Sequence, residues 1–360
     1  MEGSSEVVDL VPQEGFVGMG RLVTAAAAAR EDISSRNAAT EYLKTLGSKA
    51  SRRAILCRLN HVARWFRYPD AEHCDWHLMR YEHVIDFIDH LRHIEGRTGN
   101  HQDSPHELKV STINAYLYAI KAVARMAWSL GQMDDRNMTR ITATKAVRGR
   151  DVVKGRAMTL QESAALLDQC SDEVPREIRD KAILTLLLGN GLRRAEVAGI
   201  EMRHVDLERH EIRIRGKGNK ERTILLTPQV EKPLLHWMQT RTTLPAADKY
   251  QNMGESFDGD YLFCRFTRHC KALVKNRAMT PRAIWEISNR YIERASENVK
   301  SIKDISCHDF RRTFATRLFD YGVDIVTIKN LMGHSNISTT ARYDKRGDEA
   351  MHKAMELVQL

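Results

Sequence analysis

A basic segment that contains glycine and lacks apolar periodicity interrupts this chain at residues 144–158. The residues on both sides of it carry regular patterns of apolar positions, which indicates a linker between two folded regions. Its positive charges are spread along its length, at Lys145, Arg148, Arg150, Lys154 and Arg156. Such a stretch could follow a phosphate backbone, or it could be a solvated tether whose charge only keeps it soluble. We therefore predict two domains joined by residues 144–158.

The region before the linker has the pattern of helices. Steps of four, three and four residues between apolar positions predict a helix over 48–66, with one buried face made of Ile55, Leu59, Val62 and Phe66. A second helix is predicted over 81–93, with the apolar positions Val84, Ile85, Ile88 and Leu91. Ser111 or Thr112 can cap a long third helix. We expect 37–143 to form a compact helical domain after a flexible lead-in, 1–36.

The region after the linker combines helices with one hairpin. Thr159 can cap a helix, and an apolar run predicts another helix over 179–188. An alternating strand, a glycine-rich turn and a return strand make the only clear hairpin, over 211–226. Helical patterns then continue to the end of the chain. The predicted fold class is mainly α with a small antiparallel β-sheet in the C-terminal domain, 159–360.

Composition narrows the class of protein further. The 360 residues hold 56 Lys and Arg against 47 Asp and Glu, a net charge of +9. This surplus fits a polyanion partner, because Lys and Arg contacts to phosphate release condensed counterions. No apolar run approaches the ~20 residues of a membrane span, and the N-terminus lacks the basic-then-apolar order of a secretion signal. Six scattered cysteines are typical of reduced thiols, so we expect a cytoplasmic protein with no membrane partner.

Zinc is the metal alternative that the sequence raises. The ligands would come from a scattered set of residues: Cys264, His269, Cys270, Cys307 and His308. Their spacing fits no common zinc finger. We therefore predict no metal site, and we expect no cofactor because the sequence shows no nucleotide-binding loop.

A set of polar residues in the second region suggests chemistry. Each has an ordinary interpretation when taken alone, such as a surface arginine, a turn lysine, a capping histidine or a half-buried tyrosine. Together they are the groups that phosphoryl transfer through a protein nucleophile requires. Arginines donate to the nonbridging oxygens, a base takes the tyrosine proton, and an acid protonates the leaving oxygen. The candidate catalytic residues are Arg193, Lys217, His308, Arg311, His334 and Tyr343.

The order and spacing of five short motifs carry a family resemblance. They are GLRRAE at 191–196, GKGNKER at 216–222, HDFR with TFAT at 308–316, LMGHS at 331–335 and TTARY at 339–343. With these motifs the chain resembles the tyrosine recombinase (phage integrase) family, which includes the Xer, Cre and lambda integrase proteins. The resemblance spans about 160–350, and the helical region 37–140 is more loosely similar to the family's core-binding domain.

The resemblance implies a role for each motif residue. Arg193 and Arg311 would clamp the scissile phosphate of DNA. Tyr343 would attack it, leaving a 3′-phosphotyrosyl bond and a free 5′-hydroxyl. Lys217 would be the general acid for that hydroxyl. The activity implied is that of a site-specific DNA recombinase that cleaves and rejoins duplex DNA without ATP or a metal.

The family resemblance also implies roles for the two histidines and Glu196, and the sequence differs from the usual family pattern at two positions. The family implies that His308 accepts the proton of Tyr343 and that His334 hydrogen-bonds the phosphate. Glu196 is expected to brace its helix rather than react. The sequence departs from the family at Asn190, where Thr is frequent, and at Arg312, where His is frequent. Neither position belongs to the six chemical residues.

The family also implies an architecture and partners. Its members form a two-domain clamp around duplex DNA with an inverted-repeat core site. Candidate DNA contacts here are Arg52, Arg53, Arg58, Arg148 and Arg150. The amphipathic tail 349–360 would dock on a neighbouring protomer of a homo-tetramer, or pack on its own domain. A nucleoid-associated enzyme of a mobile element, acting in integration, excision or resolution, is the implied biology, and the need for accessory proteins or a second recombinase stays open.

Two other functions compete with this interpretation. A type IB topoisomerase uses similar chemistry but relaxes DNA without exchanging strands, and its relatives resemble the chain less around 216–222 and 331–343. A DNA-binding relative that has lost catalysis would act as a repressor or accessory factor. The six intact chemical positions argue against that second alternative.

Overall fold

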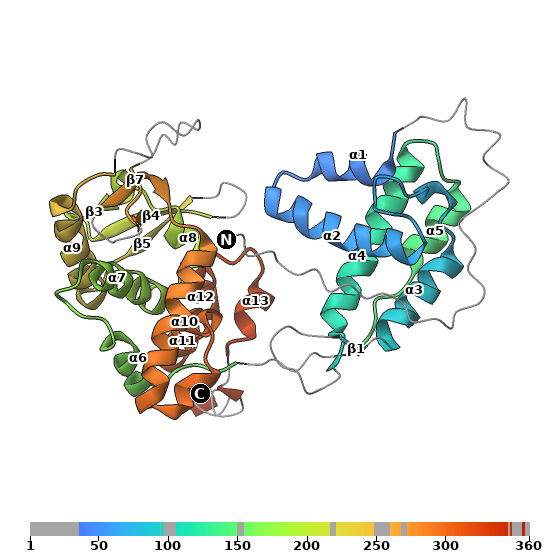
Figure 1. Ribbon diagram of the computed structural model, residues 1–360. Helices are drawn as coiled ribbons and strands as arrows, with labels where there is room; N and C mark the ends of the chain where they lie inside the picture. Colours follow the sequence, from blue (N-terminus) through green and yellow to red (C-terminus); the bar gives the residue numbers. More distant parts are fainter. Residues whose placement is uncertain are drawn as a thin grey trace. The chain divides into compact units, whose positions relative to one another are not determined.

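The computed structural model of the chain is mostly helical with small antiparallel sheets, which confirms the predicted fold class (Figure 1). The residues that it describes are 36–93, 95–96, 106–149, 155–216, 221–247, 260–267, 272–344, 346–347 and 355–356. Contacts divide the chain into two compact units, with the boundary between Val153 and Lys154. Within the described ranges, no helix is long and apolar enough to cross a membrane. Apart from Arg36, the predicted lead-in lies outside the described residues.

The first unit is built around the long helix α4 (Val110–Ser129). Its other helices are α1 (Ala38–Thr45), α2 (Lys49–Trp65), the 3-10 turn η2 (Trp76–Leu78), α3 (Tyr81–His93) and α5 (Asp135–Ala143). A short antiparallel pair joins β1 (Glu95–Gly96) to β2 (His106–Glu107). Helix α4 packs against α1, α2, α3 and α5. The core between them includes Leu59, Phe87, Leu91, Leu117 and Ile120.

The helices predicted over 48–66 and 81–93 are confirmed as α2 and α3. Two details of the prediction are wrong. Ile85 is 38% exposed, because it points about 100° away from its neighbour on the helix and so lies off the face that Ile88 buries. Helix α4 begins at Val110, so neither Ser111 nor Thr112 is its cap.

The second unit surrounds helix α7 (Pro175–Gly189), whose side chains are buried over most of its length. The helices before the sheet are α6 (Leu160–Leu167), α8 (Arg194–Ala198) and the 3-10 turn η3 (Met202–His204). Those after it are α9 (Pro228–Thr243), α10 (Pro281–Asn298), the 3-10 turn η5 (Lys300–Asp304), α11 (Cys307–Asp320), α12 (Ile325–Met332) and α13 (Ile337–Ala341). Helix α7 contacts α6, α8, α9, α10 and α11, so it forms the centre of the core.

The predicted hairpin is confirmed as β4 (Glu211–Arg215) and β5 (Glu221–Leu225), joined to a short third strand, β3 (Val205–Asp206). Ile212 and Ile214 are buried while the arginines between and after them are exposed, which is the alternation of a strand with one buried face. The expectation of a single clear hairpin is incomplete. Strands β6 (Cys264–Phe266) and β7 (Leu273–Ala278) also pair antiparallel, with a register shift between Cys264 and Arg265. That shift breaks the period-2 pattern by which a strand is recognised in a sequence.

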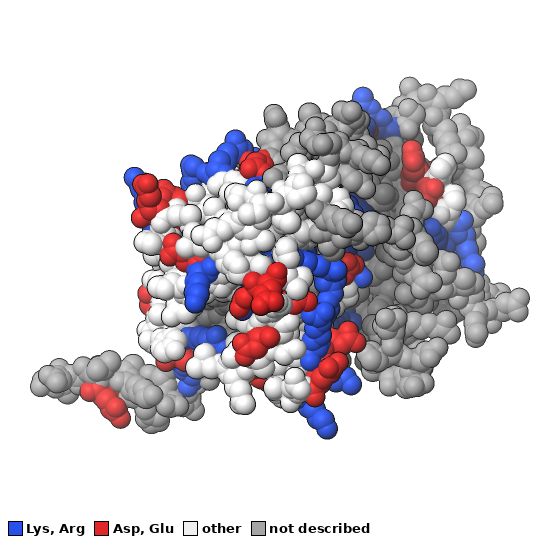
Figure 2. All heavy atoms as spheres, turned by 60° about the vertical axis from the view of Figure 1, so that its left-hand side comes forward, with Lys and Arg blue, Asp and Glu red and all other residues white. Residues whose placement is uncertain are grey.

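Charge is mixed on the face that Figure 2 shows. Lys and Arg side chains stand there beside Asp and Glu side chains. Arg282 and Glu286 form an exposed ion pair at 2.9 Å, and the exposed Arg203 pairs with the half-buried Glu201 at 2.8 Å. The net positive charge of the chain therefore does not by itself locate a surface for a polyanion.

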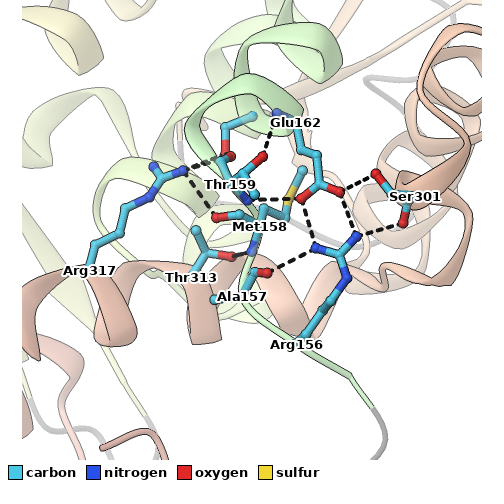
Figure 3. A network of polar contacts seen from close by, with 9 residues as sticks. Arg156, Ala157, Met158, Thr159, Glu162, Ser301, Thr313 and Arg317 are labelled. Carbon is cyan, nitrogen blue, oxygen red and sulfur yellow. Dashed lines mark hydrogen bonds and ion pairs between the residues drawn. The ribbon is translucent and has the colours of Figure 1, made fainter. Parts of the chain in front are cut away.

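A buried carboxylate fixes the start of the second unit (Figure 3). Glu162 accepts hydrogen bonds from both terminal nitrogens of Arg156, at 2.5 and 2.7 Å, and from the Ser301 hydroxyl at 2.5 Å. Thr159 completes the contacts as the cap of α6, as predicted, in a reciprocal pair with Glu162. The hydrogen bonds from Arg156 are the largest cause that lowers the pKa of Glu162 to about 2.

The same segment is tied to helix α11. The Thr313 hydroxyl accepts a hydrogen bond from the Met158 amide at 2.8 Å (Figure 3). Arg312 donates to the Gly155 carbonyl, and Gly155, at φ +104°, lies so close to Asp309 that an added Cβ would meet its carboxylate oxygen at 2.2 Å. Residues 155–158, the last of the predicted linker, are thus held on the helix that also carries two of the candidate catalytic residues.

Substituting Glu162→Gln should destabilise the second unit by about 2 kcal/mol, less than the ~3–5 kcal/mol of a fully buried pair because Arg156 is 38% exposed. Opening free energies from hydrogen exchange in α6 and α11 measure the loss. The control is Glu286→Gln, which removes an exposed ion pair worth about 0–1 kcal/mol. Equal losses in the two variants would contradict the anchoring role of Glu162.

Candidate active site

Helix α11 carries two candidate catalytic residues, one turn apart. His308 is the second residue of the helix and is exposed, while Arg311 is only 4% exposed. Desolvation and the adjacent guanidiniums lower the pKa of His308, against an opposing effect from Asp309. Burial, followed by the positive charge of Arg193, lowers the pKa of Arg311 to about 10. Arg311 is therefore a buried cation at neutral pH.

The contacts of Arg311 fix its direction. One terminal nitrogen donates to the Gly191 carbonyl, and the other donates to the Met332 carbonyl at 2.5 Å. Gly191 takes a positive φ of +58°, and an added Cβ there would meet the Phe314 ring at 2.5 Å. Only glycine leaves room for that carbonyl to face the guanidinium at this turn.

Arg193 approaches the same place from the start of α8. Its backbone amide and one terminal nitrogen donate to the Glu196 carboxylate at 2.8 and 2.7 Å, and its other terminal nitrogen donates to the Gly333 carbonyl at 3.1 Å. Its side chain remains 38% exposed, so it can still reach a ligand. The contacts of Glu196 are those of an orienting group, in line with the expectation that it braces rather than reacts.

Glu196 is shared between two arginines. It accepts two further hydrogen bonds from Arg222 of β5, at 2.9 and 3.0 Å, and is 4% exposed. Burial opposes ionisation of this carboxyl, but the hydrogen bonds from Arg222 and the Arg193 amide outweigh it and hold its pKa at about 2. Glu196 is thus a fully charged acceptor throughout the physiological range.

The remaining candidates follow helix α12. The helix ends at Gly333 in the left-handed region (φ 60°), and His334 comes next. The Nδ1 of His334 is 2.9 Å from the Thr340 hydroxyl of α13. Its ring stacks on that of Tyr343, with 6.2 Å between centroids and 23° between planes. Burial, and then the positive charges of Arg311, Arg193 and Arg222, lower the pKa of His334 to about 4, so its imidazole is neutral at pH 7.

Tyr343 itself lies in a small apolar cluster. It is 8% exposed and packs with Ala315 and Phe319 of α11 and with Ile328 and Met332 of α12. This cluster fixes the ring while His334 covers one of its faces. The nucleophile candidate is therefore positioned by two helices far away in the sequence from the strands and loops that supply the arginines.

The structure thus brings Arg193, Arg311, His334 and Tyr343 together, with His308 one turn from Arg311. Lys217 lies outside the described residues, in the connection between β4 and β5. Sequence reasoning missed Arg222. It is part of the GKGNKER motif, but nothing in the sequence tells that its partner is Glu196, which is 26 positions away.

The candidate DNA contacts of the first unit lie on or near its surface. Arg52 and Arg53 of α2 are exposed and Arg58 is half-buried. Arg148 is exposed, and Arg150 lies outside the described residues. Arg52 donates to the Leu46 carbonyl at 2.6 Å and Arg58 to the Ala54 carbonyl at 3.0 Å.

The residues considered as zinc ligands have other contacts. The Cys264 thiol lies 3.0 Å from the Tyr261 carbonyl and the Cys307 thiol 3.3 Å from the Ser288 hydroxyl. His269 and Cys270 lie outside the described residues. Where the chain is described, no group of three or more His, Cys, Asp or Glu side chains could hold a metal ion.

The two departures from the family pattern have structural partners. Asn190 donates to the Leu225 carbonyl at 2.8 Å, which ties the end of α7 to the end of β5. Arg312 lies 3.5 Å from the Asp309 carboxylate and donates to the Gly155 carbonyl. Both side chains therefore act in the scaffold of the site.

Comparison with protein families identifies this arrangement. The family model described as "Phage integrase family" matches residues 156–349, more than half of the chain and all of the described site. The chain belongs to the phage integrase family. The resemblance drawn from the five motifs is confirmed, and the protein is a tyrosine recombinase.

The chain is similar to several proteins named as tyrosine recombinases. The chain is 28% identical to tyrosine recombinase XerC of Corynebacterium glutamicum over 241 residues, which is 66% of this chain and 69% of that one. It is 28% identical to tyrosine recombinase XerD of Lacticaseibacillus casei over 233 residues, 65% and 71% of the two chains. With XerC of Myxococcus xanthus the identity is 31% over 188 residues, 52% of this chain and 57% of that relative.

Solved structures share the fold. The Tn1549 transposon integrase in complex with transposon right end DNA gives a TM-score of 0.63 at 18% identity, covering 89% of this chain and 99% of that one. XerH bound to a palindromic difH substrate gives 0.56 at 20% identity, covering 82% and 76%. A lambda integrase dimer bound to a core site gives 0.53 at 13% identity, covering 86% and 77%.

Substituting Gly333→Ala should destabilise the second unit more than Gly322→Ala. Both glycines have positive φ, so each alanine incurs the ~1–2 kcal/mol of a left-handed side chain. Only at Gly333 does the added Cβ also meet Arg222, at 2.7 Å, whereas nothing lies within 4 Å at Gly322. Overpacking there should add about 1–3 kcal/mol, measured by hydrogen exchange in α12. Equal losses would contradict the close packing of Arg222 on Gly333.

Proposed function

We propose that this tyrosine recombinase cleaves and rejoins duplex DNA at a specific site through a 3′-phosphotyrosyl bond to Tyr343. The observation that carries the proposal is the convergence of two guanidiniums, from Arg193 and Arg311, on the turn whose His334 stacks on Tyr343. A pair of fork-shaped cations beside a fixed phenol is suited to a phosphodiester, because each guanidinium can donate to nonbridging oxygens. The names of its relatives, which are recombinases, support the same activity.

In the proposed reaction the Tyr343 oxygen bonds to phosphorus as the bond to the 5′ oxygen breaks. His308 takes the phenol proton, and Lys217 gives a proton to the leaving 5′ oxygen. Arg193 and Arg311 donate to the nonbridging oxygens as their negative charge grows. His334, neutral at pH 7, donates a hydrogen bond to the same phosphate. Because the phosphotyrosine retains the energy of the broken bond, attack by a 5′-hydroxyl rejoins the strand without a nucleotide.

The proposed partner is duplex DNA with an inverted-repeat core site. Solved structures with this fold are described as complexes with DNA, among them the Tn1549 integrase and XerH. The domains predicted at 37–143 and 159–360 would close on the duplex as a clamp joined by 144–158. Arginines of α2 and the linker would contact the backbone, namely Arg52, Arg53, Arg58, Arg148 and Arg150.

The assembly and biology follow as finer parts of the proposal. A homo-tetramer would form on two DNA sites through the tail 349–360, of which the structure describes only 355–356. The likeness in fold to a transposon integrase supports a role in a mobile element. An enzyme acting on DNA in a bacterial cell would work in association with the nucleoid.

Substituting Tyr343→Phe should abolish a covalent complex with DNA, because the only oxygen able to bond to phosphorus at that position is removed. Wild type and variant are incubated with labelled fragments from the flanks of the gene and run on denaturing gels. Tyr321→Phe is the control, since Tyr321 follows α11 and is 78% exposed. A complex that persists in Tyr343→Phe would show another nucleophile. An enzyme that exchanges the flanking DNA of two sites is a recombinase, whereas one that only relaxes supercoiled DNA is a topoisomerase.

Substituting Lys217→Ala should slow cleavage by about 10²–10⁴-fold, the usual contribution of a general acid. A substrate with sulfur in place of the 5′ bridging oxygen should restore the rate, because a thiolate leaves without a proton. Cleavage rates on the two substrates are compared for the variant and the wild type. Failure of the sulfur substrate to rescue Lys217→Ala would exclude Lys217 as the acid.

A further inference from the structure

Arg222 is the arginine of the site that has all of its guanidinium nitrogens occupied by the protein. Its two terminal nitrogens donate to the two oxygens of Glu196, at 2.9 and 3.0 Å. Its Nε donates to the Leu331 carbonyl at 3.3 Å. The side chain is 16% exposed. Arg222 is therefore less accessible to a phosphate than Arg193, whose side chain is 38% exposed.

The end of α12 is held by three arginines in succession. Arg222 donates to the carbonyl of Leu331, Arg311 to that of Met332 and Arg193 to that of Gly333. The last carbonyls of a helix have no partner within it and carry the negative end of its dipole. Cationic donors therefore both satisfy these carbonyls and fix the turn that leads into His334.

Arg222 is the member of this set that connects the other groups. Through Glu196 it sets the carboxylate that receives the amide and a terminal nitrogen of Arg193. Arg222 also donates to the Leu331 carbonyl and lies close to the Cα of Gly333. These two contacts hold the turn from which His334 projects. A lysine could not make these contacts, since a single ammonium cannot donate in parallel to two carboxylate oxygens and to a carbonyl on the other side.

We propose that Arg222 is a positioning residue for DNA cleavage, which sets the orientation of Arg193 through Glu196 and the place of His334 through the end of α12. The inference rests on the proposed function and deepens it. Arg222 touches neither the phosphate nor the nucleophile. It acts instead through the positions of Arg193 and His334. A displacement of such groups by about 1 Å can slow the reaction by about 10²-fold.

The positive charge of Arg222 affects the pKa of His334, which can be measured. It is one of three guanidiniums that lower the pKa of His334 to about 4, with burial as the largest cause. Arg222→Met removes this cation, while Arg311, Arg193 and Glu196 remain beside the ring, so the pKa of His334 moves back toward its ordinary value of ~6.5. Arg222→Lys keeps a cation there, so its pH profile should stay near that of the wild type.

The test compares Arg222→Lys with Arg213→Lys in the full chain. Arg213 is on the adjacent strand β4, is exposed and makes one long hydrogen bond, to the Arg203 carbonyl at 3.4 Å. The substrate is a labelled duplex that carries the cleavage site mapped with the wild type. Rates of covalent complex formation at saturating DNA, DNA affinity and the pH profile are measured for each protein.

We expect Arg222→Lys to cleave about 100-fold more slowly at saturating DNA, with DNA affinity within about threefold of wild type. Arg213→Lys should match the wild type in cleavage rate. Glu196→Gln should reproduce the Arg222→Lys defect, and the double variant should be no worse than either, because both changes break one connection. A wild-type rate in Arg222→Lys, or a loss confined to DNA affinity, would overturn the proposal.

A second variant, Arg222→Met, covers the case in which Arg222→Lys does not fold. Glu196 keeps its two hydrogen bonds from Arg193 in this variant, so its buried charge is not left without a partner. Slow cleavage by this folded variant supports the proposal, and a wild-type rate overturns it. Failure of the wild type to form any covalent complex would instead refute the proposed function itself, whatever Arg222 does.

Discussion

The buried carboxylate of Glu196 is the interaction on which the site depends. It is ionised, nearly inaccessible to solvent and bonded to Arg193 and Arg222, which come from different elements. A buried charge of this kind is tolerated only when its oxygens are fully satisfied. Both oxygens are, and the guanidiniums that satisfy them reach onward to the end of α12. One carboxylate thereby links α8, β5 and α12 into a single frame.

Helix α11 contacts both the candidate active site and the end of the linker. Arg311 faces the Gly191 and Met332 carbonyls of the site. Arg312 and Thr313, the next residues, hold Gly155 and the Met158 amide at the end of the linker. Successive residues on a helix point about 100° apart, so one turn can address both. The start of the second unit and Arg311, the proposed phosphate ligand, are therefore fixed by the same helix.

Much of the fold followed from local patterns. The helices over 48–66 and 81–93, the Thr159 cap and the hairpin over 211–226 depend on periodicity and capping within a few residues. The hairpin of β6 and β7 escaped notice because its register shift removes the alternation. Ile85 lies about 100° around the helix from Val84 and so off the buried face. The start of α4 was mistaken because the position of a cap depends on which neighbours pack nearby, which local sequence does not contain.

The sequence alone was enough to place the chain in its family, and its five motifs predict the side chains that a phosphodiester exchange needs. How those side chains are held depends on the tertiary structure. Arg222 and Glu196 are 26 positions apart, and Arg193 and Gly333 are 140 apart. Hydrogen bonds act over about 3 Å, so whether such residues meet depends on how helices and strands pack. The placement of Tyr343 against His334, and the neutrality of that histidine among three cations, are likewise consequences of burial.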